Sequence, residues 1–305
     1  MESFIKIGGE GMLTVFTPAY NKANTLKRLY ESLKKQKNFD SSFEWIVIND
    51  GSTDQTHELM QELIKENEIA IHYIQKQNGG KQRAYNEAVQ IAKGDYFICM
   101  DGDDYFTEDA FQKIEQERKA IQDQDEIAGI GFLEYQHGSK EIVGSKFPED
   151  RMIATYSDIY YRHHVTGDKQ LTFKTKVLKE FPFPVQEGEN FISEGIVFNR
   201  IAKKYQMVFL NKPIAYVEYL ADGYSANYFS LVKKNPKGNM LYLKELYEVD
   251  PKLYHIAAFD LFGIYAKKKW KEVVKEHPNR FLATILYPVA YLKYRQKERK
   301  KGVKP

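Results

Sequence analysis

The sequence predicts an α/β protein with a doubly wound, mostly parallel sheet, and two observations lead to this fold class. Short apolar runs alternate with amphipathic helical segments at the start of the chain, which is the order of a parallel sheet with crossover helices. The 305 residues are 43% hydrophobic, which is enough for a large core. The single cysteine excludes a disulfide framework, and the longest apolar runs are too short for a membrane-spanning helix.

The individual elements follow from apolar runs and apolar spacing. Continuous apolar runs predict buried strands at residues 12–17, 43–48, 69–74 and 96–100. Helical spacing of apolar side chains, such as Leu26, Leu29 and Leu33, predicts helices at residues 25–35, 56–66 and 81–92. Further along we expect a helix at 191–205, mostly helices after about residue 228, and strands at 127–134, 170–173, 207–210 and 215–219.

Each of the first four expected strands is followed by a polar segment. Because the carboxyl ends of parallel strands meet at one edge of a sheet, where ligands bind, we expect these segments to lie close together. Any one of them alone could be an ordinary turn or a helix cap, so the convergence of all four carries the argument. The segments are Thr17-Pro18-Ala19-Tyr20-Asn21, Asn49-Asp50-Gly51-Ser52-Thr53-Asp54, Gln77-Asn78-Gly79-Gly80-Lys81 and Asp101-Gly102-Asp103-Asp104.

The last of these segments predicts a cation. Three carboxylates within four residues repel one another unless a positive charge lies among them. Oxygen ligands suit Mg²⁺ or Mn²⁺, and such metals usually also hold substrate phosphates. Gly79-Gly80 would let the backbone approach a ligand closely, and Lys81 would offer a positive charge to a phosphate. The sequence therefore predicts a metal–diphosphate site.

At these residues the sequence resembles the family 2 glycosyltransferases, which have the GT-A fold. The family patterns TPxYN, vDDGSTD, NxGxxxxxN and DxDD correspond here to TPAYN at 17–21, INDGSTD at 48–54, QNGGKQRAYN at 77–86 and DGDD at 101–104. Asn49 stands where the family usually has Asp. The resemblance implies a GT-A domain over residues 1–225, with a nucleotide-sugar half at about 12–110 and an acceptor half at about 111–225. Residues 226–305 form a helical C-terminal extension.

The resemblance also implies the reaction and the residues that serve it. Family members transfer a sugar, with inversion, from a nucleotide-diphosphate sugar, usually with Mn²⁺ or Mg²⁺. We expect a UDP-sugar as the donor of a hexosyl-type transfer. The expected donor-binding residues are Pro18, Tyr20, Asn21, Asp50, Gly80, Lys81, Asp101 and Gly102, and the expected metal ligands are Asp103 and Asp101.

An inverting transfer needs one general base to deprotonate the acceptor hydroxyl. The family places this base at the start of a helix after the sheet, and Glu194 occupies that position here. A glutamate that merely stabilises the helix start is the competing interpretation. Glu187 and Glu189, in the acidic loop before it, are the alternative bases. Lesser candidates for substrate contacts are Asp168, Lys169 and Asp222.

The C-terminal region predicts a membrane surface as a partner. Residues 281–292 are apolar apart from Thr284 and are broken by Pro288, and residues 293–305 form a basic run. This pattern fits a helix on an anionic membrane, with a solvated, frayed terminus as the alternative. The start of the chain lacks the regions of a signal peptide. We therefore expect a cytoplasmic protein at the inner face of the cell membrane, with a saccharide or lipid-linked acceptor in surface-polysaccharide or glycolipid assembly.

Composition and motifs limit the other function classes. The net charge of only +3 gives no support to nucleic acid as a partner. The absence of a G-x-G-x-x-G after the first expected strand argues against a Rossmann dehydrogenase. A sugar nucleotidyltransferase would carry a glycine-rich loop with a basic residue there, where this chain has TPAYN. A carbohydrate-binding relative without catalytic activity stays open as an alternative.

Overall fold

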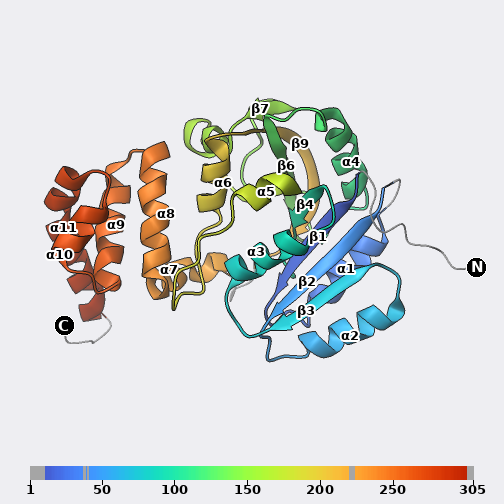
Figure 1. Cartoon of the computed structure of the whole chain (residues 1–305), viewed down its shortest axis with the longest axis horizontal. Helices are drawn as coiled ribbons and strands as arrows, with labels where there is room; N and C mark the ends of the chain where they lie inside the picture. Colours follow the sequence, from blue (N-terminus) through green and yellow to red (C-terminus); the bar gives the residue numbers. More distant parts are fainter. Residues whose placement is uncertain (1–10, 37–38, 40, 220–223, 301–305) are drawn as a thin grey trace, which may run out of the picture. The chain divides into compact units, whose positions relative to one another are not determined.

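The computed structural model describes residues 11–36, 39, 41–219 and 224–300. The strands are β1 (Leu13–Ala19), β2 (Phe43–Asp50), β3 (Ile71–Lys76), β4 (Tyr96–Cys99), β5 (Tyr105–Phe106), β6 (Ile127–Gln136), β7 (Met152–Ala154), β8 (Gln170–Lys174) and β9 (Gln206–Val217). They form one nine-stranded sheet in the order β3-β2-β1-β4-β8-β6-β9-β5, and β7 pairs with β9 (Figure 1).

The described helices vary widely in length. They are α1 (Leu26–Lys34), α2 (Thr56–Glu66), α3 (Lys81–Ile91), α4 (Ala110–Ile121), α5 (Thr175–Glu180), α6 (Gly195–Ala202), α7 (Tyr224–Lys234), α8 (Pro236–Val249), α9 (Leu253–Tyr265), α10 (Trp270–Glu276) and α11 (Arg280–Lys300). A short π-helix lies at Asp158–Arg162. Among the described residues, we find no helix that combines the length and the apolar character needed to cross a membrane.

The sheet is covered on both faces because alternate residues of its strands point in opposite directions. Val15 of β1 belongs to the main hydrophobic core, together with side chains of α1, α2 and α4. Its neighbour Phe16 packs against Tyr85 of α3, with ring centroids 5.5 Å apart. Both strand residues are fully buried. This arrangement confirms the predicted doubly wound α/β architecture.

Strand direction divides the sheet into two halves. β1 pairs in parallel with β2 and β4, and β2 pairs in parallel with β3. Beyond β4 the sheet becomes mixed, because β8 is antiparallel to both β4 and β6. The carboxyl ends of β1 to β4 therefore lie on one edge, as the sequence predicts.

Two predicted elements differ from the structure. The strands expected at 207–210 and 215–219 form a single strand, β9, which crosses the Asn211–Pro213 region through register shifts against β6. The side chain of Asn211 stabilises this irregularity by bonding both the backbone N–H and the carbonyl of Phe147. The helix expected at 191–205 is shorter, because residues 191–194 precede it as irregular chain and α6 begins at Gly195.

The chain divides into two compact units. One comprises residues 1–183 and 200–219 and holds the sheet with α1 to α5, and the other comprises residues 184–199 and 220–305 and holds α7 to α11. The segment 184–199 thus groups with the C-terminal helices. The expected domain boundary near residue 225 stays a prediction.

Candidate functional site

Asp50 ends β2 and fixes the glycine loop that follows β3. Its two carboxylate oxygens accept hydrogen bonds from the backbone N–H groups of Gly79 (2.8 Å) and Gly80 (2.7 Å). Gly80 lies at the N-terminus of α3 with a φ of 90°, a left-handed conformation that favours glycine. Asp50 is only 4% exposed, so buried, charge-assisted hydrogen bonds hold this loop.

The turns after β1 and β2 are also joined to each other. Asn21 has a φ of 53°, and its Oδ1 accepts a hydrogen bond from the backbone N–H of Thr53 at 2.8 Å. The backbone N–H of Asn21 donates to Ser52 Oγ at 2.9 Å. Tyr20, directly before it, is exposed, and Pro18 is half-buried. The structure therefore brings three of the four predicted segments to one edge of the sheet.

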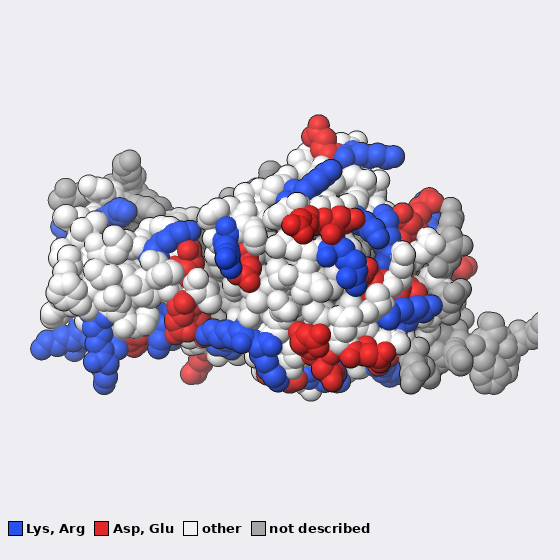
Figure 2. Space-filling view, turned by 90° about the horizontal axis from the view of Figure 1, so that it is seen from above, with Lys and Arg blue, Asp and Glu red and all other residues white. Residues whose placement is uncertain are grey.

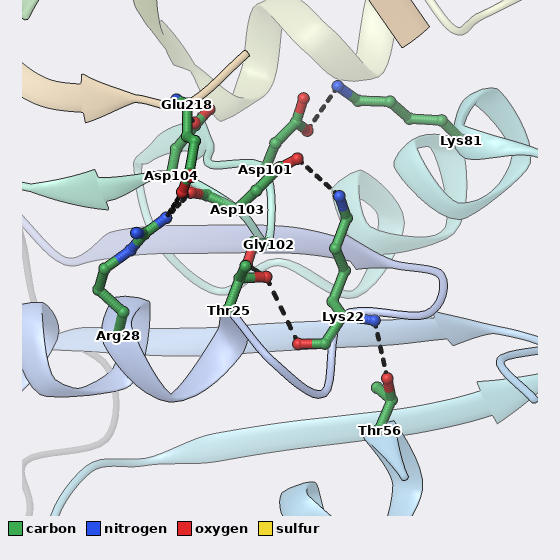
Figure 3. Close-up of polar contacts among 10 residues, drawn as sticks. All are labelled: Lys22, Thr25, Arg28, Thr56, Lys81, Asp101, Gly102, Asp103, Asp104 and Glu218. Atoms are coloured by element: carbon green, nitrogen blue, oxygen red, sulfur yellow. Dashed lines mark hydrogen bonds and ion pairs between the residues drawn. The ribbon is translucent and has the colours of Figure 1, made fainter. Parts of the chain in front are cut away.

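The fourth predicted segment, the acidic turn between β4 and β5, lies at the same edge as the other three. Cationic side chains surround this turn (Figure 3). Lys81 Nζ lies 2.6 Å from Asp101 Oδ1, and Lys22 Nζ lies 2.6 Å from Asp103 Oδ2. The two lysines come from different loops, after β3 and after β1. Each of the two predicted metal ligands thus forms an ion pair with its own lysine.

Helix α1 and the turn before it hold the backbone of the acidic turn (Figure 3). Thr25 Oγ1 donates a hydrogen bond to the Gly102 carbonyl at 2.6 Å. Arg28 donates to the Asp103 carbonyl and pairs with Glu218 Oε2 at 2.6 Å. This hydrogen bond from Arg28 lowers the pKa of Glu218. The acidic turn is therefore anchored through its backbone independently of the lysine contacts.

Asp104 is the third carboxylate of the turn and lies beside the two ion pairs. Burial, together with the smaller influence of the neighbouring Asp101 and Asp103 carboxylates, raises its pKa to about 8. Its Oδ1 accepts a hydrogen bond from the Glu218 backbone N–H at 3.0 Å. The fourth predicted segment therefore combines two lysine-paired carboxylates with one buried carboxyl group.

The donor set fits Mn²⁺ or Mg²⁺ only if a substrate completes it. Asp101 and Asp103 supply the carboxylate oxygens that these ions prefer. Within residues 11–300, excluding the gaps in the described chain, no group of three His, Cys, Asp or Glu side chains could hold a metal ion. Phosphate oxygens would have to supply further ligands, as is usual for Mg²⁺ bound with nucleotides.

Lys169, a predicted substrate contact, fastens a turn. It is 7% exposed, and its Nζ lies within hydrogen-bond distance of the carbonyls of Val143 (3.1 Å), Thr166 (2.8 Å), Gly167 (3.1 Å) and Asp168 (3.0 Å). Burial lowers the pKa of this ammonium group. These contacts give Lys169 the role of positioning the turn that carries Asp168.

Asp168 itself is exposed and accepts a hydrogen bond from the Tyr219 hydroxyl at 3.1 Å. Glu134 of β6, whose carboxyl group interacts electrostatically with Asp168, is a further polar residue that was not predicted from the sequence. Glu134 is 4% exposed, and its Oε2 has no hydrogen-bond partner in the described part of the chain. Burial raises its pKa well above the ordinary value, and Asp104 and Asp168 raise it further. The sequence signal that could have identified Glu134 is a single glutamate within the otherwise apolar strand sequence IAGIGFLEYQ.

The three glutamates proposed as bases have different surroundings. Glu194 is half-buried directly before α6, where its backbone carbonyl accepts from Val197 N at 3.0 Å. Glu189 is 5% exposed, and its carboxylate accepts the backbone N–H groups of Lys237 (2.8 Å) and Gly238 (2.7 Å) at the start of α8. Glu189 thus caps a helix.

Glu187 is exposed. Glu194 and the acidic turn belong to different units. The assignment of Glu194 as the base therefore stays a prediction. Asp222, the last predicted substrate contact, lies outside the described residues.

Comparison with known sequences identifies related proteins. A family model described as glycosyl transferase family 2 matches residues 14–180. The chain is similar to EpsJ, an uncharacterized glycosyltransferase of Bacillus subtilis, with 30% identity over 142 residues, which are 47% of this chain and 40% of EpsJ. It is also similar to the poly(ribitol-phosphate) beta-N-acetylglucosaminyltransferase TarS of Staphylococcus aureus, with 28% identity over 99 residues, which are 32% of this chain and 17% of TarS. The matched region thus spans less than half of each relative.

Comparison with solved structures supports the fold. The crystal structure of TarS residues 1–349 with UDP has a TM-score of 0.61 and 18% identity, covering 94% of this chain and 92% of that one. The mannosyltransferase PcManGT of Pyrobaculum calidifontis, in complex with GDP-Man and Mn²⁺, has a TM-score of 0.55 and 16% identity, covering 95% and 88%. At these identities the likeness confirms the predicted GT-A fold.

Proposed function

Because this chain belongs to glycosyl transferase family 2, we propose that it transfers a sugar, with inversion, from a UDP-sugar to a hydroxyl acceptor in a metal-dependent reaction. The observation that carries the proposal is the joining of four separate loops around two lysine–aspartate pairs at one edge of the sheet. This edge offers oxygen ligands for a divalent cation and ammonium groups for a diphosphate.

In the proposed reaction, the groups at this edge serve the donor, and Glu194 of the other unit serves the acceptor. Asp50 and the glycine loop orient the nucleoside, and Lys81 binds a phosphate. Asp103, helped by Asp101, would hold Mn²⁺ or Mg²⁺, which when bound stabilises the charge of the leaving diphosphate. Glu194 removes the proton of the acceptor hydroxyl as that oxygen attacks the anomeric carbon from the side opposite the leaving group.

A thermal-shift panel tests the donor site. Wild type and Asp103→Ala would be heated with UDP, UTP and a set of UDP-sugars, with Mn²⁺ and with EDTA, and the exposed Asp123→Ala serves as the matched control. A ligand at about 100 times its Kd that binds only the folded state adds roughly 2.7 kcal/mol of stability. We expect UDP-dependent stabilisation that needs Mn²⁺, is retained in Asp123→Ala and is lost in Asp103→Ala.

Two outcomes would contradict the proposal. A folded wild-type protein that responds to no nucleotide would remove the donor-site assignment and favour a carbohydrate-binding module. Stabilisation by UTP but by no UDP-sugar would favour a sugar nucleotidyltransferase. The UDP-sugar with the largest shift would identify the donor.

The acceptor side of the proposal rests on the C-terminal helices. We propose that they hold the enzyme at an anionic membrane, where a lipid-linked acceptor would be found. Residues 220–305 contain 18 Lys and Arg against 8 Asp and Glu, whereas residues 1–219 contain 27 against 34. Figure 2 shows Lys and Arg side chains beside a broad area without charged side chains at the left end, where the C-terminal helices lie.

Helix α11 presents an apolar stripe that supports this surface. Phe281, Ile285, Val289 and Leu292 follow one another at helical spacing and are between 44% and 73% exposed. On another side of the helix Ala283 and Ala290 are buried. An exposed apolar stripe beside basic residues is typical of helices that lie in a membrane interface.

Vesicle sedimentation tests the membrane proposal. The Phe281→Ser/Ile285→Ser double variant should bind vesicles containing phosphatidylserine at least tenfold more weakly than wild type, because each buried apolar side chain contributes roughly 1.5–3 kcal/mol. Val185→Ser, which alters an exposed valine in an irregular segment, should bind like wild type. Equal binding of the double variant, or equal binding of wild type to neutral vesicles, would contradict the proposal.

A further inference from the structure

Lys22 forms an ion pair with the carboxylate of Asp103, a predicted metal ligand, and neighbouring residues hold Lys22 in place. Its backbone N–H donates to Thr56 Oγ1 at 2.9 Å, and its carbonyl accepts from Leu26 N at 3.0 Å at the start of α1. Its side-chain stem crosses Gly102 so closely that a Cβ added there would lie 3.0 Å from Lys22 Cγ. The side chains of Lys22 and Asp103 are 21% and 14% exposed, so the ion pair is largely shielded from water.

This ion pair conflicts with a divalent cation at Asp103. The ammonium group already neutralises the carboxylate at 2.6 Å, and a metal ion beside it would add like-charge repulsion. A metal ion that binds alone must therefore displace Lys22 from its partner. Lys81 holds the more exposed Asp101 in the same way, so both carboxylates are neutralised without a metal.

A nucleoside diphosphate would change this balance. Its phosphate oxygens offer the ammonium group new acceptors, and they also offer the metal ion new ligands. The backbone of Asp103 would not have to move, because Arg28 and Thr25 hold the acidic turn through its carbonyl groups. Only the end of one flexible side chain has to change its partner.

We propose that Lys22 makes metal binding at Asp103 conditional on the donor: it occupies the carboxylate in the free enzyme and transfers to the diphosphate when donor and metal bind. This inference rests on the proposed donor site. By linkage, the factor by which UDP tightens metal binding equals the factor by which the metal tightens UDP binding. Lys22 is then a positioning residue that increases this coupling.

Electron paramagnetic resonance of free Mn²⁺ measures the effect directly, without activity. Mn²⁺ would be titrated with and without UDP into wild type, Lys22→Met, Lys22→Arg and Lys27→Met. Lys22→Met keeps a straight apolar stem over Gly102 but removes the charge, and Lys27 is an exposed lysine of α1 that serves as the matched control. Unchanged thermal unfolding would show that the variants fold.

We expect Lys22→Met to bind Mn²⁺ at least fivefold more tightly than wild type without UDP, and to show a correspondingly smaller tightening by UDP. Lys22→Arg and Lys27→Met should behave like wild type. Equal Mn²⁺ affinity of wild type and Lys22→Met without UDP, while UDP still tightens Mn²⁺ binding to both, would overturn the role of Lys22 alone. Failure of wild type to bind UDP, or of UDP to affect Mn²⁺ binding to either protein, would overturn the proposed donor site together with this inference.

Discussion

Two buried aspartates, one in each unit, have opposite surroundings. Asp50, at the end of β2, is 4% exposed, and each of its carboxylate oxygens accepts a backbone N–H. Asp260, in α9, is fully buried, and neither of its oxygens has a hydrogen-bond partner among the described residues. A buried carboxylate with charge-assisted hydrogen bonds can remain ionised, whereas one without partners favours its neutral form.

A third kind of carboxylate lies between these extremes. Asp103 has a charged partner, but that partner is the end of a lysine side chain. Backbone N–H groups stay in place as long as the loop is folded, whereas a lysine ammonium can move on its flexible stem. Asp50 is therefore a fixed part of this edge of the sheet, and the partner of Asp103 is the one that can move.

The largest loss of stability is expected from Asp50→Ala. The substitution removes two charge-assisted hydrogen bonds and leaves the half-buried N–H group of Gly79 and the buried one of Gly80 without their acceptor, which should lower the free energy of unfolding by about 3 kcal/mol. Asp103→Ala, the matched variant on the same edge, removes a single ion pair with a lysine whose ammonium group can move on its flexible stem, and should cost less than Asp50→Ala. Urea unfolding followed by circular dichroism measures both values, and equal losses would show that the distinction between the two carboxylates is wrong.

Local sequence signals were sufficient to predict the parallel half of the sheet. The alternation of apolar runs and helical spacing requires only neighbouring residues, and it placed β1 to β4 and their loops correctly at one edge. Asp50 and the glycine loop could be assigned to a common site because parallel strands align their carboxyl ends. The hydrogen bonds between them appeared only in the structure.

The partners of the acidic turn could not be predicted from sequence. Lys22 and Asp103 are 81 residues apart, and Arg28 and Glu218 are 190 residues apart, so no local pattern connects them. Lys22, Thr25 and Arg28 follow one another at intervals of three residues. This spacing could have predicted that their side chains lie on one side of the chain around the start of α1. Glu134 and Asp260 were overlooked because a single charge in an apolar segment does not reveal whether it will find a partner.

An effect confined to the pH dependence of stability is expected from Asp260→Asn. Burial raises the pKa of Asp260 to about 7. In the unfolded chain the pKa of this carboxyl group is about 3.9. The stability that the neutral carboxyl group contributes is therefore fully present below about pH 3.9 and is lost as the pH rises through the pKa of the folded protein. Between pH 4 and 7 the unfolded chain releases this proton first, and the free energy of unfolding should fall.

Asparagine stays neutral at every pH, so Asp260→Asn removes this dependence. The difference of about three pKa units corresponds to at most roughly 4 kcal/mol, so we expect the variant to exceed wild type by up to this amount in the free energy of unfolding at pH 8, with no gain at pH 4. Asp123→Asn, which changes an exposed aspartate in the other unit, should show wild-type behaviour at both pH values. Urea unfolding at pH 4 and pH 8 separates these cases. If the free energy of unfolding of wild type does not fall relative to that of Asp260→Asn between pH 4 and pH 8, Asp260 must have a hydrogen-bonding partner in the folded protein. The contrast between Asp260 and Asp50 would then no longer hold.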